Sequence, residues 1–211
     1  MAAQLGLFGI EEPAFDATFA RVQHRELAHD AWVEYVPGWL RGHEAVFDVL
    51  LRSTRWRSGE ERMYDRLVVT PRVFGTIPED GPGHPVIEAM RVALSQRYAE
   101  AFERVSLALY RDGRDSVAFH GDRVARTLPQ ALVATVSVGA PRRCLLRPLT
   151  YPAAEQSSRP YGGGASIAWN LGWGDLFVMG GSCQRTWQHA IPKCAHADPR
   201  IAIMFRPHWP G

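Results

Sequence analysis

The sequence after residue 103 consists of short strand-like segments separated by turns that contain glycine and proline. These segments are residues 105–110, 116–122, 131–138, 143–147, 165–169, 175–178, 186–190 and 200–205. Many short strands with such turns are typical of a sandwich or a barrel, and a double-stranded β-helix (jelly roll) fits best. Asp112-Gly113, between the first two segments, predicts a tight hairpin turn.

The sequence before residue 104 contains helix-like patterns in place of the short strand-like segments. Apolar residues from Val86 to Ala101 recur at helical spacing, and Asp80 or Gly83 is positioned to start that helix. We expect this helix to buttress a sheet, a second helix over residues 43–51, and irregular structure in the rest of residues 1–60. The predicted fold class is therefore mainly β with flanking helices (α+β). We expect one compact domain, with residues 1–103 as an N-terminal extension and residues 104–211 as the jelly-roll core.

Composition agrees with a globular protein. The chain has 211 residues, of which 46% are hydrophobic and 22% charged. The first twenty residues include Glu11, Glu12 and Asp16 and no long apolar run, so we expect no secretory signal and no membrane partner. The 3 cysteines do not make a disulfide framework and suit a reducing compartment. We expect a cytoplasmic monomer.

The charge of the chain is unevenly distributed. Residues 1–103 contain 11 arginines and 16 acidic residues, whereas residues 104–211 contain 12 arginines, 1 lysine and 6 acidic residues. A basic half suits attraction to nucleic-acid phosphates, which arginine binds in bidentate fashion. The other reading is a compositional bias of the genome, since arginines outnumber lysines by 23 to 1.

His120-Gly121-Asp122 and the distant His189 form a candidate metal-ligand set. Residues i and i+2 of a strand point to the same face, so His120 and Asp122 can converge on one ion. Two imidazoles and one carboxylate are the ligands that hold non-haem Fe(II) while leaving positions open. Each of the two parts has an alternative interpretation when taken alone. An H-x-D motif also occurs in a turn with a capping Asp, and a lone histidine such as His189 often has only a structural role.

Arg200 and Arg206 are a late pair of arginines suited to an anionic cosubstrate. Their even spacing places both on one face of a regular strand, with Ile201 and Phe205 on the other face, in packing. Their Cα atoms would lie roughly 20 Å apart, at about 3.3 Å per residue, so we expect separate roles.

Several motifs occur in a characteristic order. They are Ala108-Leu-Tyr110, His120-Gly121-Asp122, residues 136–143, residues 174–181, residues 187–193 and residues 200–206. This ordered set resembles the AlkB family of Fe(II)- and 2-oxoglutarate-dependent dioxygenases, which dealkylate nucleic-acid bases. The resemblance covers roughly residues 104–206 of the chain.

The resemblance implies a role for each matching residue. The iron ligands would be His120, Asp122 and His189. Arg200 would bind the distal carboxylate of 2-oxoglutarate, Arg206 would lie near its metal-chelating end, and Tyr110 would also contact it. Two asparagines of the family pattern are replaced, by Ala108 and Ala202, and an acidic residue that reads the damaged base is Val124.

The implied reaction uses Fe(II), 2-oxoglutarate and O2 to remove alkyl groups from bases of single-stranded DNA or RNA, with release of succinate, CO2 and an aldehyde. Tyr64, Asp65 and Arg66 fall where the family has its nucleotide-recognition lid, and Arg185 is a candidate for the substrate entrance. The arginines near the metal motifs are candidates for phosphate contacts: Arg111, Arg114, Arg123, Arg126, Arg142 and Arg143.

Two alternatives stay open. One is a 2-oxoglutarate-dependent hydroxylase of a protein or small molecule, which Val124 and Ala108 allow. The other is a non-catalytic jelly-roll module that binds a metal.

Overall fold

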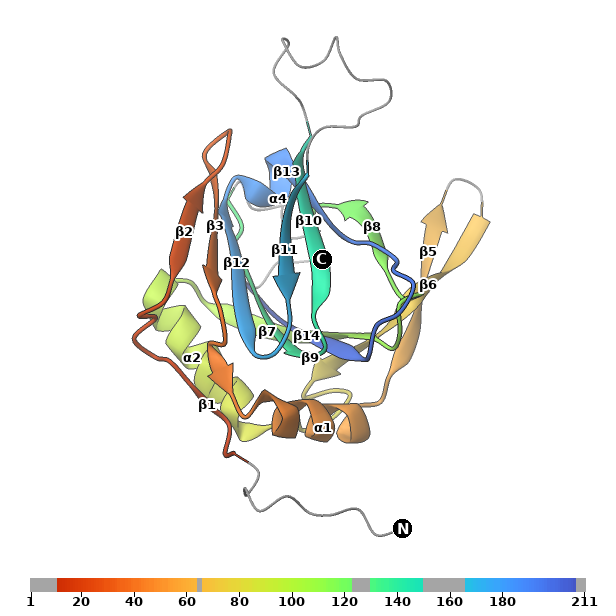
Figure 1. The fold of residues 1–211 in the computed structure, drawn as a ribbon, viewed down its shortest axis with the longest axis horizontal. Helices are drawn as coiled ribbons and strands as arrows, with labels where there is room; N and C mark the ends of the chain where they lie inside the picture. The colour runs from red at the N-terminus through yellow and green to blue at the C-terminus, as the bar shows by residue number, and fades with distance from the viewer. Residues whose placement is uncertain (1–10, 64–65, 123–129, 150–165, 208–211) are drawn as a thin grey trace.

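The computed structural model describes residues 11–63, 66–122, 130–149 and 166–207. Two antiparallel sheets face each other (Figure 1). The larger sheet has eight strands, in the spatial order β2 (Gln23–Glu26), β3 (Ala31–Val36), β12 (Asp175–Gly181), β9 (Val133–Gly139), β14 (Arg200–Pro207), β7 (Phe102–Tyr110), β6 (Arg66–Ile77) and β5 (Arg57–Met63). The smaller sheet has four, in the order β11 (Ile167–Leu171), β10 (Arg142–Pro148), β13 (Trp187–Ile191) and β8 (Val117–His120). The predicted jelly roll is confirmed.

The remaining elements lie around the two sheets. A short pair is formed by β1 (Ala14–Phe15) and β4 (Leu40–Arg41). Helices α1 (His43–Ser53) and α2 (Pro85–Tyr98) cover the outer face of the larger sheet, as Figure 1 shows, and α4 (Cys183–Thr186) is a single turn between β12 and β13. No helix in the described ranges is long and apolar enough to cross a membrane.

The larger sheet separates two apolar cores. On its outer face, Leu107 and Ile203 pack with Leu50 of α1 and Leu94 of α2. On its inner face, the core between the sheets includes Met179 and Trp187, together with Tyr110, Leu146 and Phe177. The alternation along β14 follows from this arrangement: Ile201, Ile203 and Phe205 face the helices, and Arg200, Ala202, Met204 and Arg206 line the interior. The predicted division of β14 into two faces is confirmed.

The start of α2 differs from the prediction. The helix begins at Pro85, and the side chain of His84 caps it by accepting from the Val86 N–H at 3.2 Å. Neither Asp80 nor Gly83 starts the helix. The Asp80 carboxylate instead accepts hydrogen bonds from the Thr76 N–H at 3.1 Å and from Arg57, so it fixes the turn after β6.

The predicted hairpin at Asp112-Gly113 is wrong. β7 pairs with β6 and β14 in the larger sheet, whereas β8 pairs with β13 in the smaller one. Residues 111–116 therefore cross between the sheets. The buried Arg142 guanidinium holds this crossover by donating to the carbonyls of Asp112 and Asp115, and to that of Pro192, at 2.8–2.9 Å. A turn-forming pair of residues cannot by itself tell a hairpin from a crossover.

The expectation of irregular structure in residues 1–60 is also wrong. β3 pairs along its whole length with β12, from Val36 opposite Leu176 to Ala31 opposite Gly181. Ala31, Val33 and Val36 are buried in this position. Strands from both sides of residue 104 thus belong to one sheet. The strand is only six residues long, and no residue of its neighbour β2 is buried, so its pattern is weak in the sequence.

The packing of α2 on the sheet gives a stability prediction. Leu94 is 0% exposed, whereas Val92 on the same helix is 40% exposed. We expect Leu94→Ala to lower the free energy of unfolding by about 2–5 kcal/mol, because it leaves a cavity under the helix. Val92→Ala should change it by less than about 0.5 kcal/mol. Urea unfolding followed by circular dichroism measures both, and equal losses would contradict the packing of α2 described above.

Candidate metal centre and cosubstrate cavity

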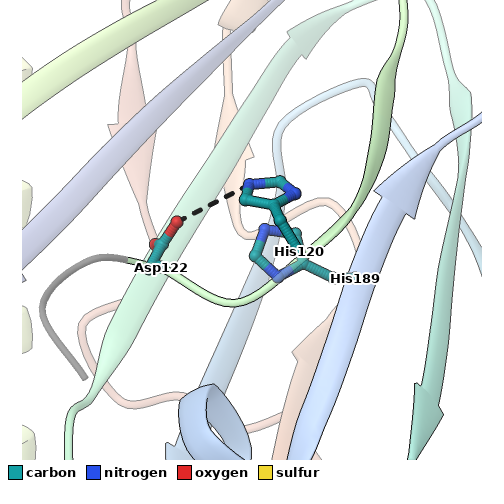
Figure 2. Close-up of side chains that lie close together, drawn as sticks. All are labelled: His120, Asp122 and His189. Atoms are coloured by element: carbon teal, nitrogen blue, oxygen red, sulfur yellow. Dashed lines mark ion pairs between the residues drawn. The ribbon is translucent and has the colours of Figure 1, made fainter. Parts of the chain in front are cut away.

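His120, Asp122 and His189 come together at one end of the space between the sheets. His189 on β13 lies directly opposite His120 on β8, and their ring centroids are 4.3 Å apart. Asp122 follows β8 after one glycine, and its carboxylate approaches the two rings (Figure 2). One ligand atom from each residue lies within 4.8 Å of the others. The predicted convergence of these three side chains is therefore present in the structure.

The hydrogen bond of His120 determines which ring nitrogen can bind a metal. Nδ1 lies 2.9 Å from the Ala118 carbonyl, which can only accept, so Nδ1 carries the proton and donates it. The lone pair is then on Nε2, which lies 3.9 Å from Asp122 Oδ1, the contact drawn in Figure 2. A ring fixed through its other nitrogen in this way is typical of metal-binding histidines.

Arg206 fixes the carboxylate of Asp122. Its Nε donates to Asp122 Oδ2 at 2.9 Å, and its Nη1 donates to the Ser106 hydroxyl. Burial raises the pKa of Asp122, but the charge and hydrogen bond of Arg206, together with the nearby His189 and His120, outweigh burial and hold this pKa well below its usual range. Asp122 is therefore ionised, with Oδ2 occupied by Arg206 and Oδ1 directed at His120.

His189 is held in the neutral form that a metal requires. Desolvation by the surrounding barrel lowers the pKa of His189 to about 4, although the nearby Asp122 carboxylate acts in the opposite direction. A neutral imidazole retains a lone pair for coordination. The three side chains together offer two imidazole nitrogens and one carboxylate, and the donor set fits Fe(II).

A cavity of about 120 Å³ extends from the metal centre into the barrel. A single water needs only about 10–15 Å³, so the cavity has room for a small molecule. Its cationic lining residues are Arg72, Arg200 and Arg206, and its walls include Tyr110, Leu171, Phe177 and Met204. Both arginines predicted from β14 therefore reach the same cavity, as expected for residues on one face of a strand.

Arg200 is buried without a carboxylate partner among the described residues. It is 2% exposed, and its Nη2 donates to the Ser137 hydroxyl at 2.7 Å. Its other two guanidinium nitrogens, Nε and Nη1, are buried and have no hydrogen-bond partner within the described ranges. The Tyr110 ring lies 5.3 Å from the Arg200 Cζ atom. Buried donors of this kind require an acceptor, and a ligand carboxylate supplies two oxygens in the matching geometry.

Ala108 and Ala202 occupy the positions where the family pattern has asparagines. They are Cα partners on β7 and β14, at 2% and 4% exposure, and both line the cavity. This part of the wall therefore presents methyl groups and no amide donors, which leaves Arg200 and Tyr110 as the polar contacts predicted at that end.

The structure places the remaining predicted residues as follows. Arg185 is exposed on α4, next to the buried Gln184. Tyr64, Asp65 and Val124 lie outside the described residues, and of Arg66 the structure describes only the backbone at the start of β6.

Sequence reasoning missed four residues around the cavity: Arg72, Ser106, Ser137 and Gln184. Ser137 had a signal, because it is a lone polar residue between Val136 and Val138. Arg72 had none, since β6 was not recognised as a strand.

Comparison with known proteins agrees with this geometry. The sequence model of the 2OG-Fe(II) oxygenase superfamily matches residues 35–206. The chain is 28% identical over 189 residues to alpha-ketoglutarate-dependent dioxygenase alkB homolog 3 of Bos taurus, covering 82% of this chain and 65% of that protein. It is 29% identical over 155 residues to the DNA oxidative demethylase ALKBH2 of Homo sapiens, covering 72% and 58%. The chain thus spans less than two thirds of the length of each of these two relatives.

Among solved structures, OsALKBH1 superimposes with a TM-score of 0.50 at 13% identity, covering 88% of this chain and 100% of that chain. A prolyl hydroxylase from Trichoplax adhaerens also gives a TM-score of 0.50, at 11% identity, covering 78% and 74%. These two similarities support the fold. From the superfamily match and the alkB relatives, the chain belongs to the AlkB family of the 2OG-Fe(II) oxygenase superfamily.

Proposed function

We propose that this protein is an Fe(II)- and 2-oxoglutarate-dependent dioxygenase that removes alkyl groups from bases of single-stranded DNA or RNA. The dioxygenase activity is proposed because two different groups of residues line the same cavity. One end has three converging metal ligands, and the other has a buried arginine with two nitrogens, Nε and Nη1, that have no acceptor among the described residues. Bound Fe(II) and 2-oxoglutarate would supply the oxidation of a C–H bond by O2, with release of succinate, CO2 and an aldehyde.

The residues of the chain divide this work among them. His120, Asp122 and His189 hold the metal, and Arg206 keeps the Asp122 carboxylate ionised and oriented. Arg200, seated by Ser137 and next to Tyr110, binds the distal carboxylate of the cosubstrate. The apolar walls exclude water from the space between them. Such a site supplies ligands, an anion anchor and a fixed position for the reacting C–H bond.

The choice of substrate rests on the relatives and on charge. The curated relatives include two AlkB homologues, and one is called a DNA oxidative demethylase. Among the candidate phosphate contacts, Arg143 is exposed, and so are Arg111 and Arg114, each paired with a neighbouring aspartate. Arg142 is buried, so we withdraw it as a phosphate contact; Arg123 and Arg126 lie outside the described residues.

The target base has to leave its stack to reach the cavity, or already be single-stranded. We assign its recognition to Tyr64 and Asp65, to Arg66 at the start of β6, and to Arg185, which is exposed on α4. Tyr64 would stack on the base, and Asp65 would accept from an exocyclic amine.

The first prediction concerns the metal ligands. His120→Ala, Asp122→Ala and His189→Ala should each abolish Fe(II)-dependent succinate formation while the circular dichroism spectrum stays that of a folded protein, because each change removes one of three ligands. His196→Ala, at an exposed histidine, is the control and should keep full activity. Substantial turnover in any of the three variants would remove that residue from the ligand set.

The second prediction concerns the anion anchor. Arg200→Ala should raise the 2-oxoglutarate concentration needed for half-maximal succinate formation roughly ten- to a hundredfold, as expected for a charge-assisted hydrogen bond of about 1.5–3 kcal/mol. Arg200→Lys should recover only part of this loss, since a point charge does not reproduce the bidentate fork. Arg52→Ala, at an exposed arginine of α1, serves as the control and should leave the titration unchanged. An unchanged 2-oxoglutarate titration for Arg200→Ala would refute the assignment.

The third prediction concerns the substrate. Oligonucleotides that carry N1-methyladenine, N3-methylcytosine or ethenoadenine should lose the modification in the presence of Fe(II) and 2-oxoglutarate, as measured by mass spectrometry. Single strands should bind better than duplexes, and binding should weaken steeply with salt because phosphate contacts release counterions. Succinate formation without a mass change in any oligonucleotide would favour a hydroxylase of a protein or small molecule instead.

A further inference from the structure

Gln184 connects α4 to the segment that carries two of the metal ligands. Its side chain is buried at 4% exposure, and its Oε1 accepts from the Asp122 backbone N–H at 3.0 Å. Its Nε2 lies 3.6 Å from the Met179 sulfur. Both ends of the amide are therefore engaged, which fixes the direction of the acceptor toward Asp122.

Gly121 shows how closely α4 approaches the same segment. A Cβ added at Gly121 would lie 2.4 Å from the Gln184 carbonyl oxygen, a distance that real Cβ atoms do not reach. The central residue of His120-Gly121-Asp122 is thus a glycine because the backbone of α4 occupies the space where a side chain would begin. The ligand segment and α4 are in direct backbone contact.

The turn between β2 and β3 holds α4 in place through hydrogen bonds. The Trp187 indole N–H, just after α4, donates to the Ala28 carbonyl at 3.0 Å, and the Ser182 N–H, just before α4, donates to the Asp30 carbonyl at 3.2 Å. Residues from the N-terminal part of the chain therefore hold α4 on both sides. Because α4 cannot move freely, the position of Gln184 relative to Asp122 is set by the fold.

We propose that Gln184 is a positioning residue for the metal ligand Asp122. This rests on the proposed function, since it takes Asp122 as a metal ligand. Gln184 fixes the backbone of Asp122, and Arg206 fixes its carboxylate through Oδ2. With both parts held, Oδ1 stays directed at His120 and into the metal site. Loss of an outer partner of a metal ligand typically weakens metal binding about 10- to 100-fold.

The test is the affinity of the full-length protein for Mn(II), measured by isothermal titration calorimetry without cosubstrate. Gln184→Met keeps the length of the side chain but removes the acceptor, so Mn(II) affinity should fall about 10- to 100-fold. Gln188→Met is the matched control. Gln188 lies beside His189, but its side chain bonds Arg147 and not the ligand segment, so this variant should bind Mn(II) like the wild type.

If Gln184→Met does not fold, a second pair of variants, Gly121→Ala and Gly113→Ala, tests the same proposal. A Cβ at Gly113 would lie 2.3 Å from the Cys194 carbonyl oxygen, a crowding like that at Gly121 but in the crossover before β8. Gly121→Ala and Gly113→Ala should both lower the melting temperature, whereas only Gly121→Ala should weaken Mn(II) binding.

Two results would overturn the proposal in different ways. Wild-type affinity in Gln184→Met, or equal Mn(II) affinity in the two glycine variants, would remove the positioning role while leaving the metal site intact. Absence of Mn(II) binding in the wild type would instead refute the proposed function, and the positioning role with it.

Discussion

The ion pair between Arg206 and Asp122 joins the two sheets of the barrel at the metal centre. Asp122 follows β8 of the smaller sheet, and Arg206 lies on β14 of the larger one, with the two side chains 9% and 14% exposed. Removing one partner of such a buried pair typically costs about 3–5 kcal/mol, because the other charge is left unpaired. The same contact keeps Asp122 ionised, so sheet assembly and the electrostatics of the metal site depend on one interaction.

Arg200 presents the opposite situation, a buried cation with incomplete bonding. Its neighbours are the Ser137 hydroxyl and the Tyr110 ring, neither of which carries a negative charge, and burial lowers its pKa. Burying a charge costs several kcal/mol unless a partner compensates. The cavity lined by Arg200 is therefore suited to an anionic ligand. Binding of such a ligand would compensate the buried charge of Arg200.

Most of the correct structural predictions came from the alternation of side chains between the two faces of a β-strand. Strand alternation was enough to place Arg200 and Arg206 on one face of β14, and both line one cavity. His120 and Asp122 line the same cavity, but β8 ends at His120, so Asp122 reaches the cavity from the segment after the strand and not from the same strand face. Motif order then assigned the family, which the superfamily match and the relatives confirm. Helices α1 and α2 were predicted from the sequence, whereas the one-turn helix α4 was not.

The missed features depend on contacts between distant segments. Whether Asp112-Gly113 makes a hairpin or a crossover depends on which strands β7 and β8 pair with, and Arg142, from another strand, holds the crossover by hydrogen bonds. β3 joins the larger sheet through its pairing with β12, far along the chain. Gln184 has no sequence signal at all, since its role arises from the packing of a one-turn helix against Gly121.

The central claim is that one cavity seats 2-oxoglutarate against a metal held by His120, Asp122 and His189. Anaerobic titration of the Fe(II)-loaded protein with 2-oxoglutarate, followed by visible absorption spectroscopy, tests this most directly. The account predicts a weak metal-to-cosubstrate absorption band that saturates with 2-oxoglutarate in the wild type. Protein that binds Fe(II) but develops no such band at any 2-oxoglutarate concentration would contradict it.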